Sequence, residues 1–325
     1  MGVLEAHTLD WINARVVRWR IGGRQPQPQA EVVRAYLETL PGDPFESIGA
    51  ADMTPVRERH SERGEFWRET GGDWVATRYP ATNGATDAAL VFLHGWLATP
   101  GHVLLMRSAA QRLLAAGIEV WIPRLPAHIE RTPPGSVSGA RCLSADLAAT
   151  GRALQLAVEE TCGLAGWLRA NGRRRVGLWG ISLGGWVAAL AATCRADWDA
   201  VALWTPVVDP LDTLRFSPLM EAIRGSIARA GIDELLWAEI FQRFAPVRRR
   251  RLVSSDRLLV IAGQYDNVVS HQAISRLRAA WGVEPLWAPH GHISILWSRR
   301  IKQACRRFLI GKLGAGREAG PATRC

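Results

Sequence analysis

The sequence predicts one large α/β domain, with a mostly parallel sheet and helices on both faces of that sheet. Short apolar runs typical of buried strands alternate with longer segments of helical periodicity through most of the chain. A hairpin pattern precedes this alternation, and together they predict an eight-stranded sheet. The chain has 325 residues, of which 48% are hydrophobic, so it can bury an extensive core as one domain.

Residues 1–63 are predicted to form a helical extension that packs on this domain. Apolar residues recur at helical spacing, at Trp11, Ile12, Val16 and Trp19 in the first helix and at Val32, Val33, Tyr36, Leu37 and Leu40 in the second. Glycines and prolines separate the two helices. Because the first helix carries tryptophans and arginines, the alternatives are a helix that contacts a membrane surface and a dimer arm.

The α/β domain is expected to cover residues 64–310. The hairpin comprises residues 65–70 and 74–80, and the later strands are expected at residues 88–93, 118–123, 176–179, 200–204, 258–262 and 284–287. Helices are expected at residues 103–116, 143–170, 270–281 and 293–309, and residues 126–139 form a loop by composition. The last segment, residues 311–325, is rich in Gly, Ala and Arg and is predicted to be disordered.

Residues 209–251 interrupt the alternation of strands and helices. This segment is longer than one crossover helix requires, and it is helical and apolar in pattern. It is therefore predicted to form a helical cap or lid that supplies apolar walls to a substrate pocket. The alternative is a pair of ordinary helices that pack on the core.

The segment around Ser182 carries the strongest chemical pattern in the chain. An apolar strand leads into the sequence Gly-Ile-Ser-Leu-Gly, and an Ala-rich helix follows. A Cβ atom two residues before or after the serine would collide with the neighbouring strand or helix, so glycine is needed at Gly180 and Gly184. This turn is expected to lift the Ser182 hydroxyl out of the sheet at the N-terminus of a helix.

Two later strand ends carry the groups that activate a serine. Asp266 follows the strand at residues 258–262, and His292 follows the short strand at residues 284–287. A serine hydroxyl needs a base to remove its proton, and a carboxylate holds an imidazole base in the required tautomer. His290 is the second candidate for the base and Asp209 for the acid; the sequence favours His292 and Asp266.

The chain order Ser182, Asp266, His292, with each residue placed after a strand, resembles the α/β-hydrolase superfamily over roughly residues 64–310. More narrowly, PRLPAHIERTP, the long helix after it and GISLGG resemble a little-characterised abhydrolase branch. The resemblance implies an α/β-hydrolase fold and a catalytic triad of these three residues. It also implies an oxyanion hole made by the backbone N–H groups of Trp96 and Leu183, with His94 ordering the loop. His102 and His128 are candidates for either the pocket or the surface.

These observations predict a serine hydrolase of the esterase or lipase type, which cleaves carboxylic esters through an acyl-enzyme intermediate. The alternatives on the same triad are a thioesterase, an acyltransferase and a peptidase, and a non-catalytic binding protein of this fold is a further one. The expected partner is a small-molecule or acyl-ester substrate. No cofactor and no metal are expected, because no His/Glu pair has the helical spacing of a zinc site.

The charge and cysteine content narrow the class of protein further. The formal net charge of +10 comes from scattered arginines, since Lys occurs only at Lys302 and Lys312, so no nucleic-acid partner is predicted. A run at residues 248–251, beside Arg243, could attract an anion, although a solvated face is the simpler explanation.

The five cysteines form no C-x-x-C pair and indicate free thiols. Without a signal-peptide pattern or a membrane-spanning segment, a cytoplasmic location is expected, and the oligomeric state is left open.

Overall fold

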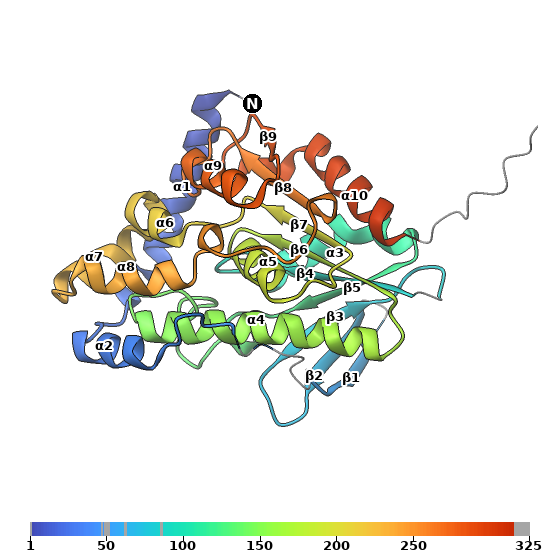
Figure 1. Ribbon diagram of the computed structural model, residues 1–325, viewed down its shortest axis with the longest axis horizontal. Coiled ribbons are helices and arrows are strands. Elements are labelled where there is room, and N and C mark those ends of the chain that lie inside the picture. The colour runs from blue at the N-terminus through green and yellow to red at the C-terminus, as the bar shows by residue number, and fades with distance from the viewer. Residues whose placement is uncertain (1, 47, 49–52, 62–63, 85–86, 315–325) are drawn as a thin grey trace, which may run out of the picture.

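The computed structural model describes residues 2–46, 48, 53–61, 64–84 and 87–314 and contains a single sheet with helices on both faces (Figure 1). The strands follow the order β1-β2-β3-β5-β4-β6-β7-β8-β9. Their bounds are β1 (Pro55–Ser61), β2 (Gly64–Glu69), β3 (Val75–Tyr79), β4 (Ala88–Leu93), β5 (Ile118–Pro123), β6 (Arg175–Ile181), β7 (Ala200–Trp204), β8 (Leu258–Gly263) and β9 (Leu286–Ala288). All pairs from β5 to β9 are parallel, so the predicted α/β class is confirmed.

The central strands are apolar along their whole length because both faces of the sheet are covered. In β4, Val91 and Leu93 pack on one face, and Leu90 and Phe92 pack on the other. Helices α3 (Pro100–Ala115) and α10 (Arg299–Leu313) cover the face of Leu90, and helices α4 (Leu147–Ala170), α5 (Leu183–Cys194) and α9 (His271–Trp281) cover the face of Val91.

The prediction of eight strands is wrong by one strand at the edge of the sheet. Strand β1, expected within the helical extension, pairs antiparallel with β2, with Pro55 opposite Glu69. Of its residues only Pro55 is buried, and the rest are largely charged or polar. An exposed edge strand needs no alternating apolar pattern, so the pattern that identifies buried strands does not find it.

At the other end of the chain, α10 continues three residues beyond Ile310. Leu309 and Leu313 are fully buried, and a Cβ atom on Gly177 of β6 would lie 2.5 Å from Leu313 Cδ1. This packing keeps residues 311–313 helical, although they were expected to belong to the disordered tail. Residues 315–325, which make up the rest of that predicted tail and include Cys325, lie outside the described residues; the four described cysteines are free thiols.

The N-terminal extension does pack on the main domain, but its first helix buries a different face from the predicted one. In α1 (Val3–Ile21) the buried residues recur every three or four positions, at Ala6, Asp10, Ala14, Val17 and Ile21. Trp11 and Trp19, expected on the packed face, are 55% and 84% exposed. Small alanine side chains let α1 approach its neighbours closely, which a search for large apolar residues overlooks.

The second helix of the extension, α2 (Ala30–Thr39), buries Val33 and Tyr36 as predicted, whereas Val32, also expected on that face, is 45% exposed. It contacts α4 and α8 (Glu234–Arg243). Two arginines, one from the run at residues 248–251 and one beside it, bind this part of the chain. Arg243 donates to the Leu40 carbonyl at 2.5 Å, and Arg249 pairs with Asp43 at 2.6 Å. These arginines therefore bind their own chain.

Residues 209–251 form a helical insertion between β7 and β8 (Figure 1). It consists of α6 (Pro210–Phe216), a 3-10 turn (Pro218–Met220), α7 (Glu221–Arg229), α8 and a second 3-10 turn (Pro246–Arg248). We call this insertion the cap. Within the described part of the chain, the search for a helix long and apolar enough to cross a lipid bilayer finds no candidate.

Candidate active site

Ser182 lies in a strained turn between β6 and α5. Its backbone has φ 54° and ψ −111°, a region that residues with a Cβ atom rarely adopt. The Ser182 N–H donates to the Trp204 carbonyl at 3.0 Å, and the Ser182 carbonyl accepts from the Trp186 N–H at 2.9 Å. The turn is thus anchored to β7 on one side and to the first turn of α5 on the other.

The two glycines of this turn are explained by close backbone approach. A Cβ atom on Gly180 would lie 2.1 Å from the Gly184 carbonyl oxygen, and one on Gly184 would lie 2.5 Å from the Leu93 carbonyl oxygen. Neither position has room for a methyl group unless the backbone moves. Helix α5 can therefore sit directly against β4 and β6, and the Ser182 side chain is the group presented at the bend.

The structure brings Ser182, His292 and Asp266 together. His292 Nε2 lies 2.9 Å from Ser182 Oγ, and His292 Nδ1 lies 2.8 Å from Asp266 Oδ2. The other oxygen of Asp266 accepts the backbone N–H groups of Val268 and Val269, at 2.7 and 2.8 Å. The Asp266 carboxylate is therefore fixed by three hydrogen bonds. Because its Oδ2 accepts from Nδ1–H, the Nε2 atom that faces Ser182 is free to take a proton.

The rival candidates lie elsewhere. His290 is half-buried, and no hydrogen bond joins its ring to Ser182 or Asp266 in the described residues. Asp209 caps α6 by accepting the Asp212 N–H, and it pairs with Arg276 at 2.9 Å. His102 is exposed and caps α3, and His128 is buried outside the pocket.

The electrostatic surroundings favour a charged imidazole at His292. Burial lowers the pKa of His292, but the charge and hydrogen bond of Asp266 and the charge of Asp10 more than offset burial, so the pKa lies above its ordinary value. The side chains of His292 and Asp266 are only 4% and 2% exposed. Little water screens the pair, which strengthens their interaction.

The loop at residues 94–97 lies against the strained turn. A Cβ atom on Gly95 would be 3.7 Å from Ser182 Cβ, and Leu97 adopts φ 57°. His94 is buried and spans this loop: its Nε2 accepts the Leu125 N–H at 3.1 Å, so its Nδ1 carries the proton and donates to the Gly95 carbonyl at 2.9 Å. Burial next to His128 holds the pKa of His94 well below its usual value, which keeps the imidazole neutral.

The two residues expected to stabilise an oxyanion, Leu183 and Trp96, line the pocket that contains Ser182. Leu183 is the first residue of α5, so its N–H has no acceptor within the helix. Trp96 lines the same pocket as Ser182 and is held by its indole N–H, which donates to the Gly139 carbonyl at 2.9 Å.

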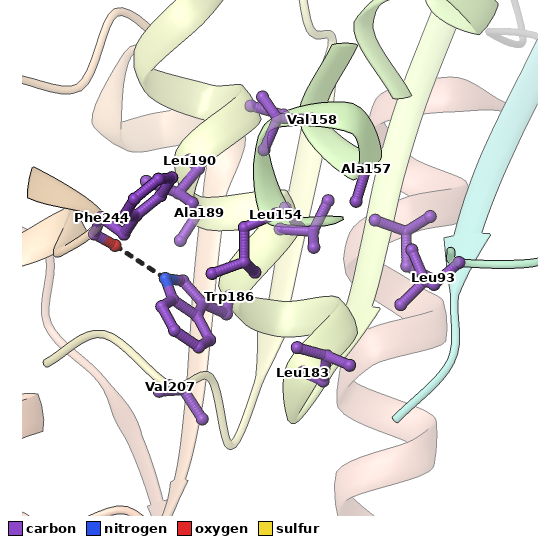
Figure 2. Close-up of a cluster of buried hydrophobic side chains, with 14 of the residues drawn as sticks. Leu93, Leu154, Ala157, Val158, Leu183, Trp186, Ala189, Leu190, Val207 and Phe244 are labelled. Carbon is purple, nitrogen blue, oxygen red and sulfur yellow. Dashed lines mark hydrogen bonds between the residues drawn. The ribbon is translucent and has the colours of Figure 1, made fainter. Parts of the chain in front are cut away.

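An apolar pocket of about 530 Å³, measured with the solvent space at its mouth, opens at Ser182. Its walls come from both the sheet domain and the cap, namely Trp96, Leu143, Leu183, Trp186, Val207, Pro210, Thr213, Leu214, Leu219, Met220, Ile223, Phe241 and Val268. Figure 2 shows Leu183 and Trp186 at the base of α5, with the Trp186 indole donating to the Phe244 carbonyl at 2.7 Å. The sequence did not indicate Leu143 or Val268 as pocket residues. Leu143, expected to begin a helix, lies in the loop before α4, and Val268 lies in the loop between β8 and α9.

Residues 90–312, more than half of the chain, match the family model described as "Alpha/beta hydrolase family". The chain belongs to the alpha/beta hydrolase family. The chain is also 28% identical over 206 residues to the uncharacterized protein Rv2627c of Mycobacterium tuberculosis (strain ATCC 25618 / H37Rv). That match covers 61% of this chain and 46% of the relative, so the chain spans about half the length of the curated relative it matches.

Solved structures show the same fold. The chain resembles acetyl xylan esterase 1 from Thermoanaerobacterium sp. JW/SL YS485 with a TM-score of 0.62, at 15% identity over 91% of this chain and 98% of that one. For an acetyl xylan esterase from Paenibacillus sp. R4 the TM-score is 0.58, at 13% identity over 90% and 99% of the two chains. A puromycin-hydrolyzing peptidase of Mycobacterium tuberculosis gives 0.53, at 17% identity over 81% and 40%. At these identities the structural likeness establishes the fold alone.

Among the described residues, no group of three or more His, Cys, Asp or Glu side chains is placed to hold a metal ion.

Substituting Gly180→Ala should disrupt the turn. The added methyl group would meet the Gly184 carbonyl at 2.1 Å, so we expect the free energy of unfolding to fall by about 2–3 kcal/mol or more, measured by urea denaturation. The matched control is Gly311→Ala in α10, where a Cβ atom has no neighbour within 4 Å and alanine should stabilise the helix by roughly 0.5–1 kcal/mol. Equal stability of Gly180→Ala and the wild type would contradict the packing explanation.

Proposed function

We propose that this protein is a serine hydrolase that cleaves carboxylic esters through an acyl-enzyme intermediate. The observation that carries the proposal is the continuous hydrogen-bonded line from Ser182 Oγ through the His292 ring to Asp266 Oδ2, with distances of 2.9 and 2.8 Å. This line ends at the mouth of an apolar pocket. A nucleophile, a base and an orienting carboxylate in this order are the groups that acyl transfer requires.

In the proposed reaction the Ser182 oxygen attacks the ester carbonyl while His292 Nε2 removes the hydroxyl proton. Asp266 holds the ring and stabilises the imidazolium that forms. The N–H groups of Leu183 and Trp96 hold the negative oxygen of the tetrahedral intermediate. His292 then returns the proton to the departing alcohol, and a water molecule, activated by the same imidazole, releases the acid from Ser182.

The pocket favours an apolar acyl group. Apart from Ser182, its lining consists of apolar side chains and one threonine, Thr213, and no charged residue is among them. Such a lining suits a hydrocarbon chain and offers nothing to bind the charged end of a peptide. The fold neighbours with esterase names agree with an ester substrate, and the peptidase neighbour makes amide cleavage the comparison to test.

Replacing Ser182 tests the nucleophile directly. We expect Ser182→Ala to lower kcat/KM for p-nitrophenyl esters by several orders of magnitude, because the step that forms the acyl-enzyme is lost. Across a series of acyl chain lengths, the wild type should prefer apolar chains longer than acetate and should cleave an ester faster than the matching anilide. The control is Ser136→Ala, a half-buried serine outside the pocket. Wild-type rates in Ser182→Ala would overturn the proposal.

The pH dependence of kcat/KM should report the pKa of His292. Its imidazole must be neutral to accept the proton, and its pKa is raised, so activity should be lost as the pH falls through a midpoint above the ordinary histidine value of about 6.5. p-Nitrophenyl esters carry no titrating group before cleavage, and because the released p-nitrophenol titrates near neutral pH, its release is read at a wavelength where both of its forms absorb equally. His290→Gln, two residues away, should leave the midpoint unchanged. A midpoint at or below 6.5 would contradict this assignment.

A further inference from the structure

Asp10 is a buried carboxylate in the middle of α1, remote in sequence from the site. Its side chain is 0% exposed. One oxygen accepts the backbone N–H of His292 at 2.9 Å and that of Asn267 at 3.3 Å, and the other accepts the N–H of Ile293 at 3.0 Å. A buried carboxylate is costly unless its oxygens are satisfied, and here backbone donors satisfy them.

The three donors belong to the two loops that carry the proposed base and acid. Asn267 directly follows Asp266, and His292 supplies its own backbone N–H. A single carboxylate on α1 therefore ties the loop after β8 to the loop after β9. The His292–Asp266 hydrogen bond joins the same loops through their side chains. Asp10 therefore holds the backbones of the two loops in the positions that the His292–Asp266 hydrogen bond requires.

Gly291, the residue before His292, leaves room for the Asp10 carboxylate. An ideal Cβ atom on Gly291 would lie 2.7 Å from Asp10 Oδ2 and 3.0 Å from Oδ1, and its three nearest neighbours are all atoms of Asp10. The backbone of Gly291 lies outside the left-handed region, so its conformation does not demand glycine. The missing side chain instead makes the space that Asp10 fills.

The charge of Asp10 also acts on the imidazole. Two acidic groups face His292, Asp266 from the loop after β8 and Asp10 from α1. Burial of the ring lowers the pKa of His292, while both carboxylates raise it. Removing the Asp10 charge should therefore lower the pKa of His292.

Helix α1 is held in this position by the cap as well. Arg18 forms an ion pair with Glu221 of α7, and the Ser226 hydroxyl donates to the Pro26 carbonyl at 3.0 Å. Helix α1 also contacts the 3-10 turn Ser294–Trp297 that follows the histidine loop. It therefore lies between the cap and the loop of His292.

We propose that Asp10 is a positioning residue for His292, so that the N-terminal helix completes the active site. The inference rests on the proposed function, since it concerns the orientation and charge of the base. It assigns α1 a part in the reaction, whereas the sequence suggested only a packed extension, a membrane-surface helix or a dimer arm.

The test is the rate at which a fluorophosphonate labels Ser182, measured from pH 5 to 9 on the full chain. Asp10→Asn keeps the size of the side chain, removes its charge and turns a donor toward a backbone N–H group. We expect the plateau rate to fall by about 10- to 100-fold, because a displaced base transfers its proton less well. We also expect the acid limb of the profile to move to lower pH.

Two controls on the same helix separate positioning from stability. Glu5→Gln removes one exposed negative charge, and Val17→Ala removes buried packing seven residues along α1 from Asp10. Both should keep the wild-type plateau and the wild-type acid limb. A plateau loss in Val17→Ala as large as that in Asp10→Asn would assign Asp10 a purely structural role and overturn the proposal.

A second variant keeps the test valid if Asp10→Asn fails to fold. Gly291→Ala leaves the charge in place but pushes the carboxylate away, so it should slow labelling in the wild-type background. Gly311→Ala in α10, where a Cβ atom has no neighbour within 4 Å, is the matched control and should label at the wild-type rate. A folded Gly291→Ala protein that labels as fast as the wild type would contradict the fitted contact.

The outcomes distinguish the two proposals. Labelling of Asp10→Asn at the wild-type rate, with an unmoved acid limb, would overturn the role of Asp10 and leave the proposed function standing. A wild-type protein that the probe does not label at Ser182 would overturn the proposed function and this inference with it.

Discussion

Ser182 is held at φ 54° by a turn in which two glycines pack backbone against backbone. Such a conformation costs on the order of 1–3 kcal/mol and persists only where the surrounding packing fixes it. Here α5 sits against β4 with no room for a methyl group at Gly180 or Gly184. The Ser182 hydroxyl is therefore held in a fixed position at the C-terminal ends of the parallel strands. The loops after β8 and β9 need only bring Asp266 and His292 to that point.

The residues of this site could be found in the sequence because the C-terminal ends of parallel strands all lie at the same end of a sheet. Ser182, Asp266 and His292 each follow an apolar run, so a correct prediction of the strands already places these three residues close together. The choice of His292 over His290 could not come from the strands. It depends on the path of a short loop, in which His292 turns inward to a distance of 2.9 Å from Ser182.

Other features depend on tertiary packing that leaves little trace in the sequence. Strand β1 is polar because only one of its residues meets the core. The packed face of α1 combines two alanines and an aspartate with Val17 and Ile21, whereas Trp11 and Trp19 face outward. Asp10 did leave a signal, since it lies four residues from both Ala6 and Ala14 on one helical stripe. Its partner His292 is 282 residues away along the chain, and no local pattern reaches that far.

The cap and α1 lie together at the left of Figure 1, beyond one end of the central strands. The cap supplies pocket walls, and α1 joins the cap to the histidine loop. The central claim, that Ser182 is acylated with His292 as its base, is tested most directly by mass spectrometry of protein quenched during turnover of a p-nitrophenyl ester. An acyl adduct on the peptide that contains Ser182, lost in His292→Ala, is the predicted result. An adduct on any other residue, or a burst of p-nitrophenol release without an adduct on Ser182, would contradict it.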